Sequence, residues 1–464
     1  MSKVLLITID ALRYDHSLGD SDAEYMPFLN SLGSEGYVNH NAVSTGSGTS
    51  TSFPGILASS LPLDYGYRGL NSGHTTIQEV LKSNGISTIG ISGNLATSRV
   101  FNYDRGFQYY RDTMGSGLER RVYKFVKDSK FEKAAKRIHR IKRTIQSKNN
   151  KNSYPVPYKK ADEITNEFKN IINNMSGETD WFCWLHYMDP HNPYSPPLDK
   201  VKQYYDGDFD LYEVNKLVDR WSSERPSLYQ GSNDNISDTE LEALKGYYRA
   251  EVSFIDDNLS ELVDWLDEQQ GLDDVTLLIC ADHGEEFLDH GHYGHRPKLF
   301  DELIHVPFVF KDFSNTSHDE EIEVDGIISL LDLAPTITDL FNVERPNKWK
   351  GQSLLDKNYS RDEAISELSH RSGLGGNVDV EEAVISARSM KYKFIRNNQI
   401  GDQMAYDLIS DPNETRDLYP EDPERFEELE KISKNRIEAI INRSVDESIS
   451  GDVESRLEEL GYIS

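Results

Sequence analysis

The chain has 464 residues, in which 79 Asp and Glu outnumber 50 Lys and Arg, giving a formal net charge of -29 at pH 7. This excess argues against general nucleic-acid binding, because most of the surface would repel a phosphate backbone. It is typical of the acidic surfaces of salt-adapted proteins, where dissolved salt screens self-repulsion. We therefore expect an acidic, halophilic protein whose unfolding temperature rises between low and molar salt; a constant temperature would contradict this.

Both cysteines, Cys183 and Cys280, lie inside apolar runs, and their number excludes a disulfide scaffold. The N-terminal residues enter an apolar strand directly, without the charged and long apolar regions of a signal peptide. No apolar run reaches the ~18 residues that cross a bilayer. These features predict a cytoplasmic protein with buried, reduced thiols.

The first predicted strand, Val4 to Ile9, ends at Asp10, which taken alone would more often cap a helix than bind a ligand. Residues 44–52 then crowd glycine and hydroxyl side chains just before the apolar residues 53–57. Such a loop places backbone N–H groups at a helix N-terminus, where an anion binds well. A flexible linker is the alternative, but linkers rarely lead straight into an apolar helix.

Residues 75–94 alternate a helix pattern with a strand pattern. Ile77, Val80 and Leu81 mark one helical face, Gly85 ends the helix, and residues 87–91 form the next buried strand. This rhythm predicts an α/β fold with a mostly parallel sheet and helices on both faces.

Residues 118–152 form a basic segment in an otherwise acidic chain, with cationic side chains around apolar ones. A solvated helical insertion and a helix that contacts an anionic membrane or substrate are equally compatible with this pattern. Anionic liposome binding that survives deletion of residues 118–152 would exclude the membrane contact.

A second polar cluster follows the apolar run 181–185. His186, Asp189 and His191 emerge where prolines stop regular structure, which predicts a stiff loop at the sheet edge. Taken alone, His186 would more often be a satisfied structural histidine, whereas Asp189 and His191 are better placed to face a site. The polar residues 199–238 that follow are expected to be mobile.

The third cluster is the richest. After a helix over residues 241–266, an apolar strand ends in Asp282-His283-Gly284-Glu285 and continues into a loop with Asp289, His290, His292 and His295. Three polar clusters at the ends of apolar runs favour a metal site over solvated turns. Residues 305–310 form another strand and residues 330–337 open a further helix.

Taken in order, these motifs resemble the sulfatase branch of the alkaline phosphatase superfamily along nearly the whole chain. The matching segments are residues 7–13, the hydroxyl loop with residues 57–62, residues 189–194, 282–285, 294–295 and 305–307, and near the C-terminus residues 391–395 and 406–414. The resemblance implies an alkaline-phosphatase-like catalytic domain over residues 1–374, carrying the insert at 118–152. A smaller α+β region over residues 375–464, with an acidic terminal helix, would follow.

The resemblance also implies roles for single residues. Asp10, Asp282 and His283 would bind a divalent metal, with Asp189 and the nucleophile Thr49 as further ligands. Counting back from residues 57–59 places the nucleophile at Thr49, with Ser52 as the alternative. His191 and His295 would hold the oxygens of the ester or a second metal, while His186, Asp189 and His290 have less certain matches.

The chemistry explains this set of residues. A metal lowers the pKa of a neutral hydroxyl and screens the anionic ester that it approaches, and a histidine near the leaving oxygen could protonate it. Carboxylate oxygens with one imidazole suit Ca²⁺, Mg²⁺, Mn²⁺ or Zn²⁺ without deciding among them.

Two departures from the sulfatase pattern bear on the substrate. Formylglycine sulfatases carry Cys or Ser in a Cys/Ser-x-Pro-Ser-Arg frame, whereas this chain has Thr49 there and Phe53 in place of the arginine. Formylglycine cannot be made from threonine. We therefore expect a metal-dependent hydrolase of phosphate or sulfate esters with a Thr nucleophile, phosphoesters or phosphodiesters being favoured. A sulfatase, or a transferase of phospho-groups to a glycan or lipid acceptor, is the alternative.

Overall fold

A computed structural model of the chain describes most of its length. The described residues are 2–19, 24–65, 70, 73–113, 154–175, 179–223, 235–270, 275–313, 322, 324–369, 380–398 and 400–442. The predicted basic insert at 118–152 and the predicted terminal helix beyond residue 442 lie outside them, so the proposed membrane contact stays a prediction.

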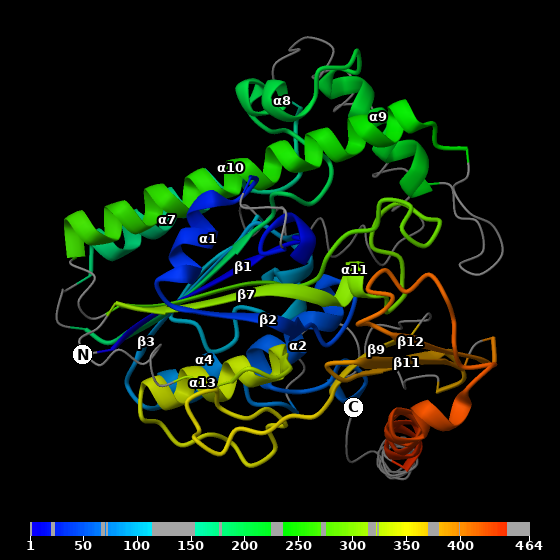
Figure 1. Cartoon of the computed structure of the whole chain (residues 1–464). Helices are drawn as coiled ribbons and strands as arrows, with labels where there is room; N and C mark the ends of the chain where they lie inside the picture. The colour runs from blue at the N-terminus through cyan, green and yellow to red at the C-terminus, as the bar shows by residue number, and fades with distance from the viewer. Residues whose placement is uncertain are drawn as a thin grey trace, which may run out of the picture.

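Residues 3–329 contribute the strands of an eight-stranded sheet with the order β4-β3-β5-β1-β6-β7-β2-β8 (Figure 1). Among these strands β7 alone runs antiparallel to its neighbours, which confirms a mostly parallel sheet. The strands are β1 (Lys3–Ile9), β2 (Tyr37–Val43), β3 (Ser87–Ser92), β4 (Tyr109–Arg111), β5 (Trp181–Tyr187), β6 (Val275–Ala281), β7 (His305–Asp312) and β8 (Ile328–Ser329).

The centre of the sheet is apolar on both sides. Every residue of β1, β5 and β6 is buried, as expected for parallel strands covered on two faces. Ile9 pairs with Tyr187 of β5 and with Ala281 of β6, so the three strands end level with one another. The residues that follow them therefore meet at one edge.

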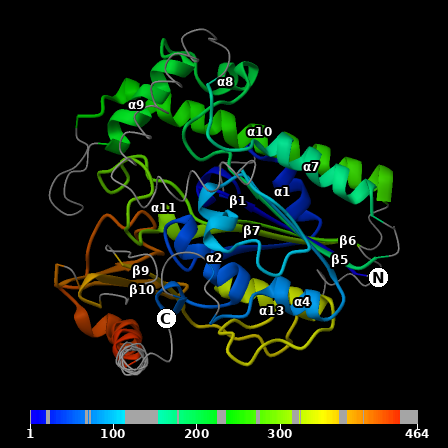
Figure 2. The ribbon, with the colours of Figure 1, turned by 180° about the vertical axis from the view of Figure 1, so that it is seen from behind.

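Helices cover both faces of the sheet, as predicted. One layer contains α1 (Pro27–Ser34), α7 (Ala161–Asn173) and α10 (Asp238–Gln270). The opposite layer contains α2 (Thr49–Ala58), α4 (Ile77–Ser83) and α13 (Leu333–Leu340) (Figures 1 and 2). Within the described part of the chain, no helix combines the length and apolar character needed to cross a membrane.

The expectation of a mobile segment at residues 199–238 was wrong for its described part. Two helices form there, α8 (Leu198–Tyr204) and α9 (Leu211–Ser223). The apolar residues of α9 recur at helical spacing and are buried, namely Leu211, Val214, Leu217, Val218 and Trp221. Because this stripe lies along one face, α9 packs against α10 although its other residues are polar.

Short helices connect the main elements. They are α3 (Pro62–Tyr65), α11 (Asp301–Ile304) and 3-10 turns at Tyr14–His16, Leu95–Thr97, Arg99–Phe101, Leu330–Asp332, Val380–Glu382 and Pro423–Phe426.

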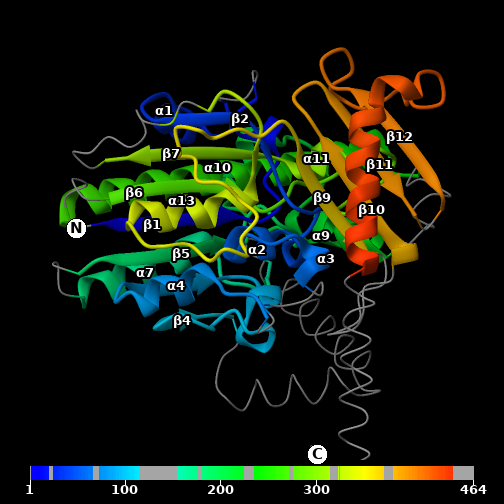
Figure 3. The ribbon, with the colours of Figure 1, turned by 90° about the horizontal axis from the view of Figure 1, so that it is seen from below.

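A second, antiparallel sheet completes the described chain, with the order β12-β11-β10-β9. Its strands are β9 (Ala364–Ser369), β10 (Ala383–Arg388), β11 (Tyr392–Asn397) and β12 (Asp402–Asp407), so it begins before the predicted boundary at 375. A helix over residues 427–442 crosses this sheet (Figure 3). The backbone N–H of Glu367 in β9 donates to Thr45 O at 2.9 Å, which ties the second sheet to the hydroxyl loop.

Candidate active site

Parallel strands deliver polar residues to one edge of the large sheet. Asp10 directly follows β1, Asp282 directly follows β6, and Asn94 lies two residues after β3. The backbone N–H of Asp10 donates to Tyr187 O at 2.9 Å, and that of Asp282 donates to Ile9 O at 3.3 Å. The strand pairing thus extends to the two aspartates, whose side chains lie outside the carboxyl ends of the strands.

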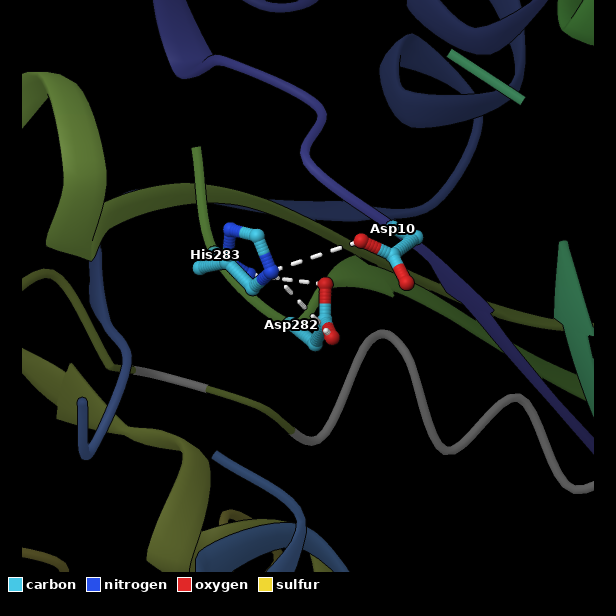
Figure 4. Close-up of side chains that lie close together, drawn as sticks. All are labelled: Asp10, Asp282 and His283. Carbon is cyan, nitrogen blue, oxygen red and sulfur yellow. Dashed lines mark hydrogen bonds and ion pairs between the residues drawn. The ribbon is translucent and has the colours of Figure 1, made fainter. Parts of the chain in front are cut away.

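Asp10, Asp282 and His283 form a compact group of metal-capable side chains, all fully buried. One ligand atom from each lies within 4.8 Å of the others. The Nε2 atom of His283 is 3.3 Å from Asp10 Oδ1 and 3.8 Å from Asp282 Oδ2 (Figure 4). The structure brings these three predicted ligands together.

The same three atoms, Asp10 Oδ1, Asp282 Oδ2 and His283 Nε2, are buried without a hydrogen-bond partner among the described residues. Unsatisfied buried polar atoms are costly, so three of them converging on one point fit a divalent cation that would satisfy all three. The other nitrogen of His283, Nδ1, lies 2.8 Å from the carbonyl of Gly284 and therefore carries the hydrogen. This tautomer leaves the Nε2 lone pair for a metal.

The pKa values of this group show how crowded its charges are. Burial raises the pKa of Asp10, but the nearby imidazoles of His191, His186 and His283 outweigh it and hold this pKa well below its usual range. Burial and the charge of Asp10 raise the pKa of Asp282. Burial disfavours the charged form of His283, yet the neighbouring carboxylates raise its pKa to about 10. In the metal-free group a proton on His283 offsets the two carboxylates.

Thr49 is the first residue of α2, whose N-cap is Gly48. The helix forms here because Phe53, Ile56 and Leu57 are spaced to bury one face, whereas the preceding glycine and hydroxyl residues end regular structure. The Thr49 hydroxyl donates to Asp10 Oδ2 at 3.3 Å. Thr49 therefore touches the same carboxylate whose other oxygen belongs to the metal-capable group.

Ser52, the alternative nucleophile, lies one helical turn further on and is fully buried. Its hydroxyl bonds Ser44 Oγ at 2.9 Å and the carbonyls of Gly46 and Gly48 at 3.1 Å each. These contacts stabilise the hydroxyl loop, and none of them leads toward Asp10.

Asn94 is a site residue that the sequence reasoning missed. Its Nδ2 donates to Asp10 Oδ2 at 2.6 Å and to Thr49 Oγ1 at 3.3 Å. The side-chain oxygen accepts from the backbone N–H of Ala96 at 2.7 Å, so it caps the turn after β3 and fixes the amide. A polar residue at the end of a buried parallel strand was the available signal.

His186 also belongs to the site. Its Nε2 lies 3.3 Å from Asp10 Oδ2, and its Nδ1 lies 2.9 Å from the hydroxyl of Thr8. The indole N–H of Trp184 donates to that same hydroxyl at 2.9 Å. Strands β1 and β5 thus supply a buried hydrogen-bonded chain of Trp184, Thr8 and His186, and this chain ends at the carboxylate of Asp10.

His191 and His295 face each other across the site, with ring centroids 5.0 Å apart. His295 is also 4.6 Å from the ring of His283, and its Nδ1 lies 3.0 Å from Glu285 Oε1. His191 instead bonds through Nδ1 to the carbonyl of Asn192. Burial lowers the pKa of His191, whereas the charges of His295 and His191 overcome burial and lower the pKa of Glu285.

Asp189 does not join the metal-capable group. Its Oδ2 accepts from the backbone N–H of Ala161 at 2.9 Å, and Lys160 Nζ lies 4.0 Å from its Oδ1. Burial raises the pKa of Asp189, and burial together with the charge of Asp189 raises the pKa of Glu251 to about 8. Asp189 and Glu251 thus form a buried acidic pair beneath the loop that carries His191.

Most of the His-rich loop serves to hold its own shape. Asp289 binds the guanidinium of Arg13 at 2.8 Å, and His290 Nδ1 lies 2.8 Å from Glu302. The backbone N–H of His292 donates to the side chain of Glu286 at 2.8 Å. Within this loop it is His295 that reaches the site.

Neither cysteine can serve as a nucleophile here. Cys183 lies in β5 and Cys280 in β6, and both are fully buried. Burial raises the pKa of both thiols, which keeps them protonated.

A family model described as Sulfatase matches residues 2–343, well over half of the chain. The chain belongs to the sulfatase family. A second model, described as the C-terminal region of N-sulphoglucosamine sulphohydrolase, matches residues 288–443. Membership confirms the resemblance to sulfatases that the motifs carry.

Individual relatives are distant. The arylsulfatase of Clostridium perfringens (strain 13 / Type A) is 24% identical over 283 residues, which cover 59% of this chain and 57% of that protein. The sulfatase-family chain thus spans little more than half the length of this relative. The phosphonate monoester hydrolase of Agrobacterium radiobacter superimposes with a TM-score of 0.70 at 17% identity, covering 96% of each chain. The structure of BT4656 in complex with its substrate D-glucosamine-2-N,6-O-disulfate gives a TM-score of 0.67 at 16% identity, covering 95% of this chain and 98% of that one.

Proposed function

We propose that this protein is a metal-dependent hydrolase of anionic esters, in which Thr49 is the nucleophile and phosphodiesters or other phosphoesters are favoured over sulfate esters. The observation that carries this proposal is the position of the Thr49 hydroxyl, 3.3 Å from Asp10 Oδ2 at the start of α2. The other oxygen of Asp10 belongs to the metal-capable group with Asp282 and His283.

A divalent metal bound by Asp10, Asp282 and His283 would lower the pKa of the nearby hydroxyl and offset the charge of the ester. The chain's own residues then supply the remaining functions. Asn94 fixes the Thr49 oxygen, and Asp10 Oδ2 accepts its hydrogen bond. The N-terminus of α2 adds backbone N–H groups and a favourable helix dipole for an anionic ester.

Catalysis would proceed in two displacements. Attack by Thr49 Oγ1 forms an ester between the enzyme and the phosphoryl group, and the bond to the leaving oxygen breaks with its electron pair on that oxygen. Attack by water on the enzyme ester then returns a free Thr49 hydroxyl and releases the acid. His191 and His295 are the side chains at the open side of the site that can move protons in these steps.

Two observations support phosphoesters. The motif resemblance assigns Thr49 to the position of the residue that becomes formylglycine in sulfatases, and formylglycine cannot be made from threonine. The fold also resembles phosphonate monoester hydrolases, one with a TM-score of 0.70. A sulfate ester is the second candidate substrate, because the curated relatives include a protein named arylsulfatase.

A substrate panel tests the proposal. Aryl phosphomonoesters, aryl phosphodiesters and aryl sulfates are assayed with Ca²⁺, Mg²⁺, Mn²⁺ and Zn²⁺ at high salt, with Thr49→Ala and Ser52→Ala as matched variants. We expect the phosphodiester to be turned over fastest, with activity lost in Thr49→Ala and kept in Ser52→Ala. Aryl sulfate as the best substrate would instead favour a sulfatase.

The same assay distinguishes hydrolysis from transfer. When an acceptor alcohol is added, a hydrolase releases mainly free phosphate ester, whereas a transferase forms the phosphorylated alcohol as its main product. Full activity of Thr49→Ala toward every ester would refute the proposed nucleophile.

A further inference from the structure

Glu285 is a buried carboxylate beside the site that the metal-capable group does not include. Its side chain is fully buried, and Oε1 lies 3.0 Å from Nδ1 of His295. Its backbone carbonyl accepts from Arg13 at 2.9 Å, which anchors the residue. The second carboxylate oxygen, Oε2, has no hydrogen-bond partner among the described residues. The hydrogen bond to His295 is thus the polar contact that the Glu285 carboxylate makes among the described residues.

The ring of His295 lies close to the residue that precedes the proposed nucleophile. A Cβ atom added to Gly48, the N-cap residue before Thr49, would lie 4.0 Å from Cδ2 of His295. The Cδ2 side of the ring therefore lies beside the residue before Thr49, whereas Nδ1 is held by Glu285. The side chain of His295 is 29% exposed, so part of the ring is accessible to a substrate.

His191 is held differently, although its ring faces His295 at 5.0 Å. Its Nδ1 bonds a backbone carbonyl, that of Asn192, instead of a carboxylate. A carbonyl fixes the ring but brings no negative charge to stabilise a second ring proton. The two histidines are therefore prepared for different tasks.

We propose that Glu285 is a positioning residue that holds the Nδ1–H of His295 and directs Nε2–H to the leaving oxygen of the ester attacked by Thr49. This inference rests on the proposed function of the site. The hydroxyl proton of Thr49 passes to solvent before attack; as Thr49 Oγ1 then bonds to phosphorus, the bond to the leaving oxygen breaks and its electron pair stays on that oxygen. The proton then moves from Nε2 to this oxygen, while Nδ1–H remains bound to Glu285.

A carboxylate behind the imidazole matters for two physical reasons. It fixes the ring's orientation and tautomer, so that Nε2 is the nitrogen that exchanges protons with a substrate. It also places a buried negative charge beside Nδ1, which strengthens the hydrogen bond that holds the ring. Esters with poor leaving groups need the proton most, because a basic oxygen departs slowly as an anion.

A leaving-group series tests the proposal. Phenyl and p-nitrophenyl phosphodiesters are compared in wild type, Glu285→Gln, His295→Ala and the double variant. We expect Glu285→Gln to lower kcat/KM by ~10²-fold or more for the phenyl ester but by less than ~10-fold for the p-nitrophenyl ester. The double variant should lose no more than His295→Ala alone, since the two residues act as one unit. Equal losses on both esters, or losses that multiply, would overturn the proposal.

The chain offers a matched control for this series. Glu302 also binds a histidine of the same loop, with Oε1 2.8 Å from Nδ1 of His290 and its side chain nearly buried. Because no hydrogen bond joins this pair to Thr49 or His295 among the described residues, Glu302→Gln should change turnover of both esters by the same factor. A selective loss on the phenyl ester in Glu302→Gln would show that leaving-group sensitivity does not report on Glu285.

A spectroscopic measurement separates this inference from the proposed function. In protein labelled with ¹⁵N-histidine, long-range ¹H–¹⁵N spectra should show Nδ1 of His295 carrying a proton, with the signal assigned by its loss in His295→Gln. Glu285→Gln should shift this signal, whereas Glu302→Gln should not. An unprotonated Nδ1 would overturn the role of Glu285 even in an active enzyme. Failure of the wild type to cleave any ester would refute the proposed function and leave this result standing.

Discussion

The side-chain amide of Asn94, two residues after β3, donates to Oδ2 of Asp10 at 2.6 Å. The same nitrogen is 3.3 Å from Thr49 Oγ1. Asn94 therefore joins the carboxylate of the proposed metal site to the proposed nucleophile, and it does so from a turn that its own side-chain oxygen caps.

Replacing Asn94 should impair catalysis more than folding. Asn94→Ala removes a hydrogen bond to a charged group, worth ~1.5–3 kcal/mol, so we expect kcat/KM to fall by ~10- to 100-fold. Asn94→Asp should be worse, because a second carboxylate would face Asp10. Asn84→Ala is the matched control, since the Asn84 amide donates to Val80 O and Ser83 Oγ at the end of α4. Activity of Asn94→Ala equal to that of the control would contradict the assigned role.

Metal binding should distinguish the two aspartates that the sequence suggested as ligands besides Asp10. Asp282→Asn removes a ligand and should weaken divalent-metal binding by more than the ~10- to 100-fold that loss of an outer-shell partner costs. Asp189→Asn should leave the affinity unchanged, because Asp189 bonds Ala161 and lies outside the metal-capable group. Titration calorimetry measures both, and equal weakening would restore Asp189 as a ligand.

Metal affinity should also rise with pH. The pKa of His283 is about 10 in the metal-free protein, so its imidazole is protonated at pH 7 and must lose that proton to bind a metal. Below this pKa, each metal ion that binds displaces one proton from His283. Above it, His283 is already neutral and no proton is released. Calorimetry in buffers of different ionisation enthalpy counts the protons. Metal uptake at pH 7 without proton release would contradict this expectation.

The acidic pair beneath the His191 loop should make stability depend on pH. Burial and the charge of Asp189 raise the pKa of Glu251 from 4.5 to about 8. Between these values the folded state holds a proton that the unfolded state has lost, so stability falls as pH rises from about 4.5 to about 8.

Glu251→Gln should remove this dependence, because the amide is neutral at every pH and can still accept from Ser195 N–H. We expect the variant to gain more in Tm at pH 8 than at pH 5 relative to wild type. Glu261→Gln, at an exposed position of the same helix, is the control and should shift Tm equally at both values. A change in Tm that is the same at both pH values in Glu251→Gln would refute the raised pKa of Glu251.

The site residues that could be predicted from the sequence are those that directly follow the buried strands. Asp10 and Asp282 each follow a continuous apolar run, and parallel strands with level ends bring such residues together. Asn94 follows β3 under the same rule, but a polar residue in a turn gave no separate sign of its contact with Asp10. The fold class was predictable for a similar reason, since helix and strand periods alternate along the chain.

Contacts between distant residues could not be read from the sequence. His290 had a less certain match in the family pattern; in the structure it stacks on Phe300 with ring centroids 3.6 Å apart and lies 3.2 Å from the carbonyl of Glu414. A residue that follows β12 thus helps to fix the orientation of His290. The helix α9 was missed because its short apolar stripe lies within a strongly polar segment.

The most direct test of the account is the identity of the covalent enzyme ester. Wild-type protein turning over an aryl phosphodiester is quenched in acid within the first turnovers, and its peptides are examined by mass spectrometry. We predict a phosphoryl ester on Thr49 that is absent in Thr49→Ala and present in Ser52→Ala. An ester on Ser52, or turnover of Thr49→Ala at the wild-type rate, would contradict the account.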